Sequence, residues 1–231
     1  MSIPYVIHQT WKDEHLPPAF ERMSRTWRDH HRHWEYCFWT DKMNREFIAM
    51  HYPSFLPVYD SYPTAIQRVD AVRYFVLLKY GGFYIDLDFE CLENIDPLAS
   101  QGACIFGKEP LEHCLIHEKD IIISNAFMGA VPGCGFLQQI CNALEIGRHI
   151  TEHLNDRILE STGPFMLSHM YSNYPHKKEI TLLEPDMLYP LTKEEIAAWG
   201  DEPFNTTIRS QAPHAYGIHR FAGTWWKKEV V

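Results

Sequence analysis

Three carboxylates alternate along one short stretch of the chain, YGGFYIDLDFE, which runs from Tyr80 to Glu90. If this stretch is a single strand, its apolar residues share one face, while Tyr84, Asp86, Asp88 and Glu90 share the other. Carboxylates spaced about 6–7 Å apart on one face repel each other. They are either solvated on a half-buried strand, or neutralised by a hard divalent cation such as Mg²⁺ or Mn²⁺ whose shell an anionic ligand completes.

A second charged pair lies in the helix that leads into this stretch. The segment TAIQRVDAVRYFVLLKYGG predicts a helix from Thr64 to Tyr80 that ends at Gly81–Gly82 and is largely buried, because apolar residues cover much of its circumference. Asp70 and Arg73 lie three residues apart on one side of it. Two interpretations stay open: an ion pair within the helix, or two side chains that point into the same polar cavity as the acidic strand and bind a ligand's hydroxyl groups.

Strands and helices alternate along the chain, which predicts a three-layer α/β domain with a mostly parallel central sheet. Besides the acidic stretch, we expect strands within residues 3–10, 34–40, 103–109, 120–132, 180–185 and 214–221. Further helices are expected at 17–31, after a cap at Asp41, at 134–147, from 162–164 onward and at 193–199. Ligands of such sheets gather at the carboxyl ends of the strands, where Asp86 and Asp88 would lie.

Composition excludes several classes of protein. The chain has 231 residues and a net charge of −9, with no run of lysines or arginines, which argues against a nucleic-acid binder. Its six cysteines form no C-x-x-C pair, so neither a zinc ribbon nor a disulfide framework is expected. The amino-terminal sequence MSIPYVIHQTW lacks a secretion signal, and no apolar run is long enough to span a membrane. These features predict a cytoplasmic protein with reduced thiols.

Three segments carry a resemblance to a known family: IPYVIHQTW, WEYCFWTD and AIQRVDAVRYFVLLKYGGFYIDLDFE. Together they resemble glycosyltransferase family 32, whose sugar-binding region contains an Asp-x-Asp motif and whose members include the fungal initiating α-1,6-mannosyltransferase and bacterial capsule enzymes. A lone Asp-x-Asp is weak evidence because it is frequent by chance. The ordered set D-x-x-R-Y, then G-G-x-Y-x-D-x-D, after H-Q-T-W is specific. The likeness is densest over residues 3–100, with weaker echoes at Asn125, at TGPF from Thr162 and in HRFAGTWW.

The resemblance implies a GT-A fold, a Rossmann-like α/β domain that binds a nucleotide-sugar. A single domain would span residues 1–231, with a nucleotide-sugar half at 3–100 and, at 101–231, an acceptor half and a carboxyl-terminal tail that supplies a metal ligand. By the same resemblance, Asp88 binds Mn²⁺ or Mg²⁺ directly, Asp86 reaches the ribose or a water on the metal, and His219 completes the metal shell. Asn125 matches an amide near the reaction centre.

The resemblance further implies a set of donor-binding residues. Asp70 and Arg73 match the pair that grips the donor sugar's hydroxyl groups, and Thr10 and Trp11, in HQTW, lie against the base and ribose. Tyr84 belongs to the motif of the acidic strand and Trp225 covers the diphosphate. The ending differs from the common family pattern in carrying Thr224 in place of serine.

The prediction for function is therefore a metal-dependent, retaining transfer of a hexose from a nucleoside diphosphate sugar to a hydroxyl group of a glycan or glycolipid. A UDP-sugar is slightly preferred over GDP-mannose, and capsule or surface-glycan synthesis is the expected setting. A lipid-linked acceptor would bring the protein to the cytoplasmic membrane face. The alternatives are a metal-dependent hydrolase that uses Asp86 and Asp88, and a non-catalytic nucleotide-sugar-binding or scaffold protein on the same fold.

Other histidines are expected to be structural. His8 is predicted to be a hydrogen-bonded core residue of a central strand, and the cluster of His30, His31 and His33 a solvated turn. The spacing in LEHCLIHEK, residues 111–119, is compatible with metal binding, but no second half-site is evident. We therefore expect a surface loop or lid there.

Overall fold

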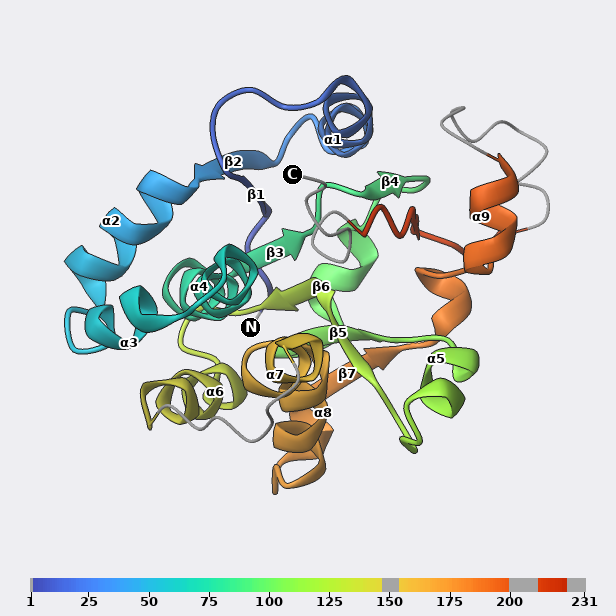
Figure 1. The fold of residues 1–231 in the computed structure, drawn as a ribbon. Helices are drawn as coiled ribbons and strands as arrows, with labels where there is room; N and C mark the ends of the chain where they lie inside the picture. The colour runs from blue at the N-terminus through green and yellow to red at the C-terminus, as the bar shows by residue number, and fades with distance from the viewer. Residues whose placement is uncertain (1, 147–153, 200–211, 224–231) are drawn as a thin grey trace.

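The structure, a computed structural model, describes residues 2–146, 154–199 and 212–223 (Figure 1). Its strands are β1 (Val6–Trp11), β2 (Glu35–Thr40), β3 (Gly82–Ile85), β4 (Phe89–Cys91), β5 (Cys104–Lys108), β6 (Ile123–Ala130), β7 (Ile180–Leu183) and β8 (Gly217–His219). Its α-helices are α1 (Pro18–His30), α2 (Asp41–His51), α3 (Leu56–Ser61), α4 (Ala65–Tyr80), α5 (Leu111–Ile116), α6 (Gly135–Ile146), α7 (Leu154–Ser161), α8 (Pro164–Ser172) and α9 (Lys193–Trp199). Among the described residues, no helix combines the length and apolar character that crossing a membrane requires.

The central sheet has six strands in the order β2-β1-β3-β6-β5-β7. Strand β1 runs parallel to β2 and β3, and β5 runs parallel to β7. Strand β6 lies between β3 and β5 and is antiparallel to both. All the other strands of this sheet therefore point the same way, and the prediction of a mostly parallel sheet is confirmed.

Opposite faces of this sheet carry different helices (Figure 1). The Tyr84 ring, on one face of β3, packs against Arg73 of α4, with 4.6 Å from the guanidinium carbon to the ring centroid. The neighbouring Phe83 faces the other way and contacts Phe127 of β6, which packs in turn against Trp27 of α1 at a ring distance of 6.1 Å. Helix, sheet and helix form three layers, as the sequence predicts.

Helix α4 begins and ends where its sequence directs. The Thr64 hydroxyl accepts a hydrogen bond from the Gln67 N–H at its amino end, and Gly81 closes its carboxyl end at φ +66°. Gly82, at φ +90°, starts β3, and a Cβ there would lie 2.6 Å from the Val6 carbonyl oxygen of β1. Only glycine allows this close approach, which places β3 beside β1 directly after the helix.

The acidic stretch is not one strand, and that prediction was wrong. Strand β3 ends at Ile85, and a turn closed by a 3.1 Å bond from the Phe89 N–H to the Asp86 carbonyl leads into β4. Strand β4 leaves the central sheet and pairs with β8 in a separate two-stranded sheet. The alternation of residue types continues across the turn, but the pairing partner changes, so Glu90 does not share a strand face with Asp86.

Three smaller expectations also need correction. Thr40 caps α2, with its hydroxyl accepting from the Met43 N–H at 3.3 Å, and Asp41 is the first helical residue. Residues 111–116, expected as loop, form the short helix α5, and α7 was not anticipated. His31 is buried rather than solvated, and its Nε2 accepts a hydrogen bond from the Ile95 N–H at 2.9 Å.

His8 is the core histidine that the sequence predicts. It is buried on β1, where its Nε2 donates to the Gly81 carbonyl at 2.9 Å and its Nδ1 accepts from the Trp39 indole N–H at 3.2 Å. This pair of bonds requires the neutral ring. Burial lowers the pKa of His8 from its usual 6.5 to about 4.

This lowered pKa makes stability depend on pH. Because the unfolded state binds a proton to His8 before the folded state does, the free energy of unfolding falls as pH drops below 6.5, until the folded pKa near 4 is reached. Between pH 7 and about pH 5 this one group should remove about 2 kcal/mol. We expect His8→Gln, which does not titrate, to lose that part of the pH dependence in urea unfolding. Identical pH dependence in both proteins would contradict it.

Candidate active site

Two aspartates of the turn and one histidine of the distant strand β8 converge at one point. Asp86 follows β3 at the carboxyl end of that strand, Asp88 precedes β4, and His219 lies opposite Phe89 in the β4–β8 pair. One ligand atom from each of the three side chains lies within 4.8 Å of the others. Among the described residues, Asp86, Asp88 and His219 form the one cluster of at least three acidic, histidine or cysteine side chains that could hold a metal ion.

The charges in this group favour an ionised Asp88. Its Oδ1 lies 3.2 Å from the His219 Nε2, and its Oδ2 accepts from the Ala222 N–H at 3.1 Å. Burial acts to raise the pKa of Asp88, but His219 and these hydrogen bonds outweigh it and hold the pKa below its usual value. Asp88 in turn raises the pKa of His219 against the effect of burial. The pKa of Asp86 is raised by burial, which Arg73 opposes.

The donor set suits a divalent cation of intermediate hardness. Two carboxylates and one imidazole can bind Mn²⁺, whereas Mg²⁺ prefers oxygen ligands alone. The His219 ring is held in place by Phe89 and Phe221, whose ring centroids lie 4.7 and 4.5 Å from its own. Its other nitrogen, Nδ1, has no hydrogen-bond partner in the described part of the chain. Because Nε2 is the nitrogen that lies beside the Asp88 carboxylate, the residues fit a metal bound through this atom.

A buried guanidinium lies beside these carboxylates. Arg73 donates from Nη1 to the Asn125 carbonyl at 2.7 Å, and its Nη2 lies 2.9 Å from the Asp70 Oδ1 and 3.5 Å from the Asp86 Oδ1. Its carbon lies over the Tyr84 ring. The two side chains form an ion pair within α4, as the first interpretation holds, and Arg73 also faces the acidic turn. That they bind a ligand's hydroxyl groups stays a prediction.

Asp70 accepts hydrogen bonds from outside its own helix as well. The Asn125 amide donates to its Oδ1 at 3.0 Å, and the Thr162 hydroxyl donates to its Oδ2 at 3.3 Å. Burial raises the pKa of Asp70 to about 7, although Arg73 opposes this shift. Thr162 was not among the predicted site residues; its place in the segment TGPF was the available signal.

The predicted nucleotide-binding residues lie at the same sheet edge. Thr10 and Trp11 end β1, next to β3. The Thr10 hydroxyl donates to the Trp39 carbonyl at 2.9 Å and accepts from the Asn44 amide at 2.8 Å, so both of its roles are already used within the fold. The Trp11 ring packs on Phe20, and its buried N–H has no partner in the part of the chain that the structure describes. The expected role of Trp225 falls outside the described residues.

An ion pair that sequence reasoning missed fastens β8 to the acidic turn. The Arg220 Nη2 lies 2.6 Å from the Glu90 Oε2, its Nε donates to the same oxygen at 3.2 Å, and its backbone N–H donates to the Asp88 carbonyl at 2.8 Å. Arg220 directly follows His219, so the pair fixes the backbone that carries the histidine. Glu90, the third carboxylate of the acidic stretch, therefore serves the structure of the site.

Gln9 of β1 holds the backbone where the acidic turn begins. Its amide donates to the Ile85 carbonyl at 3.2 Å and to the Asp86 carbonyl at 3.4 Å, and its own carbonyl accepts from the Tyr36 hydroxyl at 3.0 Å. The backbone at the start of the acidic turn is therefore held by side chains of β1 and β2. Gln9 lies within the segment HQTW, which was the available sequence signal.

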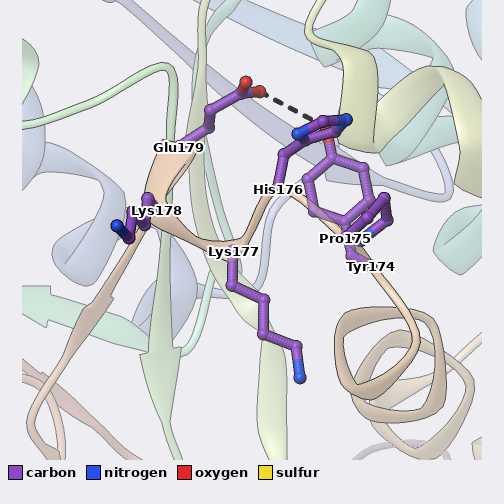
Figure 2. Close-up of a pocket in the computed structure, with 6 residues that line it drawn as sticks. All are labelled: Tyr174, Pro175, His176, Lys177, Lys178 and Glu179. Carbon is purple, nitrogen blue, oxygen red and sulfur yellow. Dashed lines mark hydrogen bonds between the residues drawn. The ribbon is translucent and has the colours of Figure 1, made fainter.

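Two other places do not contribute to this site. Cys114 of α5 is buried among apolar side chains, and the His113 Nδ1 lies 2.9 Å from the Glu109 carboxylate in a half-buried pair that supplies no ligand atom to the group. A surface hollow of about 460 Å³ is lined by residues 174–179 (Figure 2), where the Tyr174 hydroxyl donates to the Glu179 carboxylate at 3.4 Å. It precedes β7, at the amino end of a strand parallel to β5 and hence at the sheet edge opposite the carboxylates.

Comparisons with known proteins agree with the geometry. Residues 17–104 match the family described as the glycosyltransferase sugar-binding region containing a DXD motif. Inositol phosphoceramide mannosyltransferase 3 of Schizosaccharomyces pombe is 40% identical over 171 residues, which cover 74% of this chain and 45% of that protein. Mannosyl phosphorylinositol ceramide synthase SUR1 of Saccharomyces cerevisiae is 35% identical over 191 residues, covering 79% and 47%. The chain spans about half the length of the curated relatives it matches.

Among solved structures, the PaToxG glycosyltransferase superimposes with a TM-score of 0.55 at 12% identity, covering 93% of this chain and 86% of that one. This likeness concerns the fold alone, and it confirms the expected GT-A architecture.

Breaking the buried pair of Asp70 and Arg73 should lower the stability of the fold. Asp70→Asn removes the nearest counter-charge of a buried guanidinium, so we expect the free energy of unfolding in urea to fall by about 3 kcal/mol. The matched control is Asp60→Asn, which removes the counter-charge of the exposed Arg45 at a similar distance of 2.8 Å and should change little. Equal effects of the two substitutions would show that burial of the charge is unimportant.

Proposed function

Through residues 17–104 the chain belongs to the family of glycosyltransferase sugar-binding regions that contain a DXD motif, and on this premise we propose that it transfers a hexose from a nucleoside diphosphate sugar to a glycolipid hydroxyl group. The convergence of Asp86, Asp88 and His219 beside the buried Arg73 carries the proposal. A diphosphate held by a metal needs acidic ligands, and a charged guanidinium beside them can help to orient the sugar.

The donor of choice is GDP-mannose. From the sequence a UDP-sugar had a slight preference, but the matched relatives carry names that specify mannosyl transfer. Of the two donors considered, GDP-mannose is the one that delivers this sugar. UDP-hexoses are the alternative donors, and the binding test below compares them with GDP-mannose.

Asp88 and His219 would hold the divalent cation, with Asp86 at its side. When bound, such an ion neutralises the diphosphate and stabilises the charge that develops on the departing nucleotide. The low pKa of Asp88 keeps this carboxylate ionised at neutral pH, so the chain presents the negative charge that a cation needs. Arg220 and Glu90 hold β8 against the turn, so the ligands are brought together before the donor arrives.

Arg73 and Asp70 would orient the donor sugar. Arg73 is already bonded on one side to the Asn125 carbonyl, so its orientation is set before binding. The Asn125 side chain, bonded to Asp70, lies in the same buried cluster and would line the reaction centre. Retention of the anomeric configuration, through a front-face path in which the leaving phosphate helps to deprotonate the acceptor, is part of this proposal and rests on the family resemblance.

The acceptor would be a lipid-linked hydroxyl group. Both relatives carry names that specify a phosphoinositol-ceramide product or substrate, and each is at least 35% identical to this chain over more than 170 residues. Inositol phosphoceramide is therefore the acceptor to test first. The earlier expectation of capsule synthesis has no support from the matched relatives.

The proposal is tested by calorimetric binding of GDP-mannose and UDP-hexoses, each beside its free nucleotide, with Mn²⁺, Mg²⁺ or a chelator, followed by turnover with inositol phosphoceramide. We expect metal-dependent binding of GDP-mannose that exceeds that of GDP, and mannosyl transfer. Binding without transfer would favour a non-catalytic protein, and release of free hexose without an acceptor would favour a hydrolase.

Asp88→Asn checks the metal assignment. Because the neutral amide cannot supply the charge that balances the cation, metal-dependent donor binding should fall by at least about a hundredfold, which corresponds to about 2.7 kcal/mol. Asp60→Asn, an exposed aspartate away from the site, should bind donor as the unchanged protein does. Normal binding of both donor and Mn²⁺ by Asp88→Asn would show that the metal lies elsewhere.

A further inference from the structure

One short helix exposes three large aliphatic side chains. On α5, the side chains of Leu111, Leu115 and Ile116 are 70, 70 and 72% exposed. Among the described residues, Met50 of α2 is the other large apolar side chain exposed to this degree, at 74%. A contiguous aliphatic cluster costs free energy in water and usually marks a contact with another apolar phase.

The helix is firmly attached on its other side. Cys114 is buried against Ile122, Leu159 and Phe165, and the Lys119 ammonium lies 4.4 Å from the Phe165 ring centroid. The Lys119 N–H closes the helix end on the Cys114 carbonyl at 2.9 Å. The exposed leucines and isoleucine are therefore presented by a packed scaffold, with one face toward the domain and the other facing outward.

The helix that carries this outward face stands at the same sheet edge as the candidate active site. Helix α5 follows the carboxyl end of β5, which is parallel to β7 and antiparallel to β6, so α5 stands at the same sheet edge as the acidic turn after β3. The His113 ring packs on Phe221 at 5.5 Å, and Phe221 packs on His219 at 4.5 Å. Two ring contacts thus connect the inner side of α5 to the metal-site histidine.

We propose that Leu111, Leu115 and Ile116 dock the protein on the surface of a lipid bilayer by inserting into its outer hydrocarbon, so that the acceptor's head group meets the carboxylate site. This rests on the proposed function, in which the acceptor is lipid-linked. A bilayer fits better than a protein partner, because protein interfaces draw their binding energy chiefly from tryptophan, tyrosine and arginine, and the patch contains aliphatic side chains.

The charges around the patch specify the kind of bilayer. Residues 108–120 contain two lysines and four carboxylates, so the segment is acidic and would not be drawn to anionic lipids. Docking must then be driven by burial of the aliphatic side chains, as for an interfacial amphipathic helix. It should occur on neutral phosphatidylcholine and should persist at high salt, where electrostatic attachment is screened.

The test is flotation of the full chain with phosphatidylcholine vesicles at low and high salt. We expect the unchanged protein to float with the vesicles at both salt concentrations, and the combined variant Leu111→Ser, Leu115→Ser, Ile116→Ser to lose at least about tenfold in bound fraction. The matched control is Met43→Ser with Met50→Ser, which removes exposed apolar side chains from α2, on the far side of the molecule from α5 (Figure 1), and should float normally.

Donor binding separates this inference from the proposed function. The triple variant should bind GDP-mannose and Mn²⁺ as the unchanged protein does, and this binding also shows that the variant is folded. If the triple variant does not fold, the single substitution Ile116→Ser replaces it in the flotation test. The inference is overturned if the unchanged protein stays off the vesicles while binding donor, or if the variant floats equally well. It is also overturned if ultracentrifugation shows that the patch instead joins two copies of the chain, with the triple variant monomeric. Vesicle binding without any donor binding would refute the proposed function alone.

Discussion

The candidate site depends on the interactions of one buried group, the guanidinium of Arg73. A guanidinium stays charged in a protein interior, so the fold must surround it with acceptors. Its acceptors come from three places: Asp70 on its own helix, the Asn125 carbonyl on β6 and the Asp86 carboxylate after β3. Satisfying one charge therefore fixes the position of α4 against the sheet and draws the first residue of the acidic turn toward it.

A second constraint brings the carboxyl-terminal part of the chain to the same point. Pairing of β4 with β8 places His219 opposite Phe89, and the Arg220–Glu90 ion pair reinforces that pairing. Of the three candidate metal ligands, Asp86 and Asp88 are therefore close in sequence, and His219 comes from a distant part of the chain. Phe221, which follows at once, carries the contact onward to α5, so the carboxylate site and the aliphatic patch share one edge of the domain.

Elements with strong local signals were predicted closely. Helix α4 has a threonine cap, a continuous apolar surface and two glycines at its end, and all three signals act within the segment itself. The break at Asp86 was not predicted, because period-two alternation shows that a chain is extended but not which strand it pairs with. Helix α5 was missed for a related reason: its six residues are too few to show a helical period, and its outward face is apolar.

The sequence by itself determined the types of the main elements, the three-residue spacing of Asp70 and Arg73 and the grouping of the acidic residues, since caps, periodicity and short spacings are local properties of the chain. Tertiary structure alone decided which of those acidic residues belong to the site: Asp86 and Asp88 face Arg73 and His219, whereas Glu90 holds Arg220. It also decided that Thr162 reaches Asp70. These contacts join segments far apart along the chain, and they form only when packing of the layers brings those segments together.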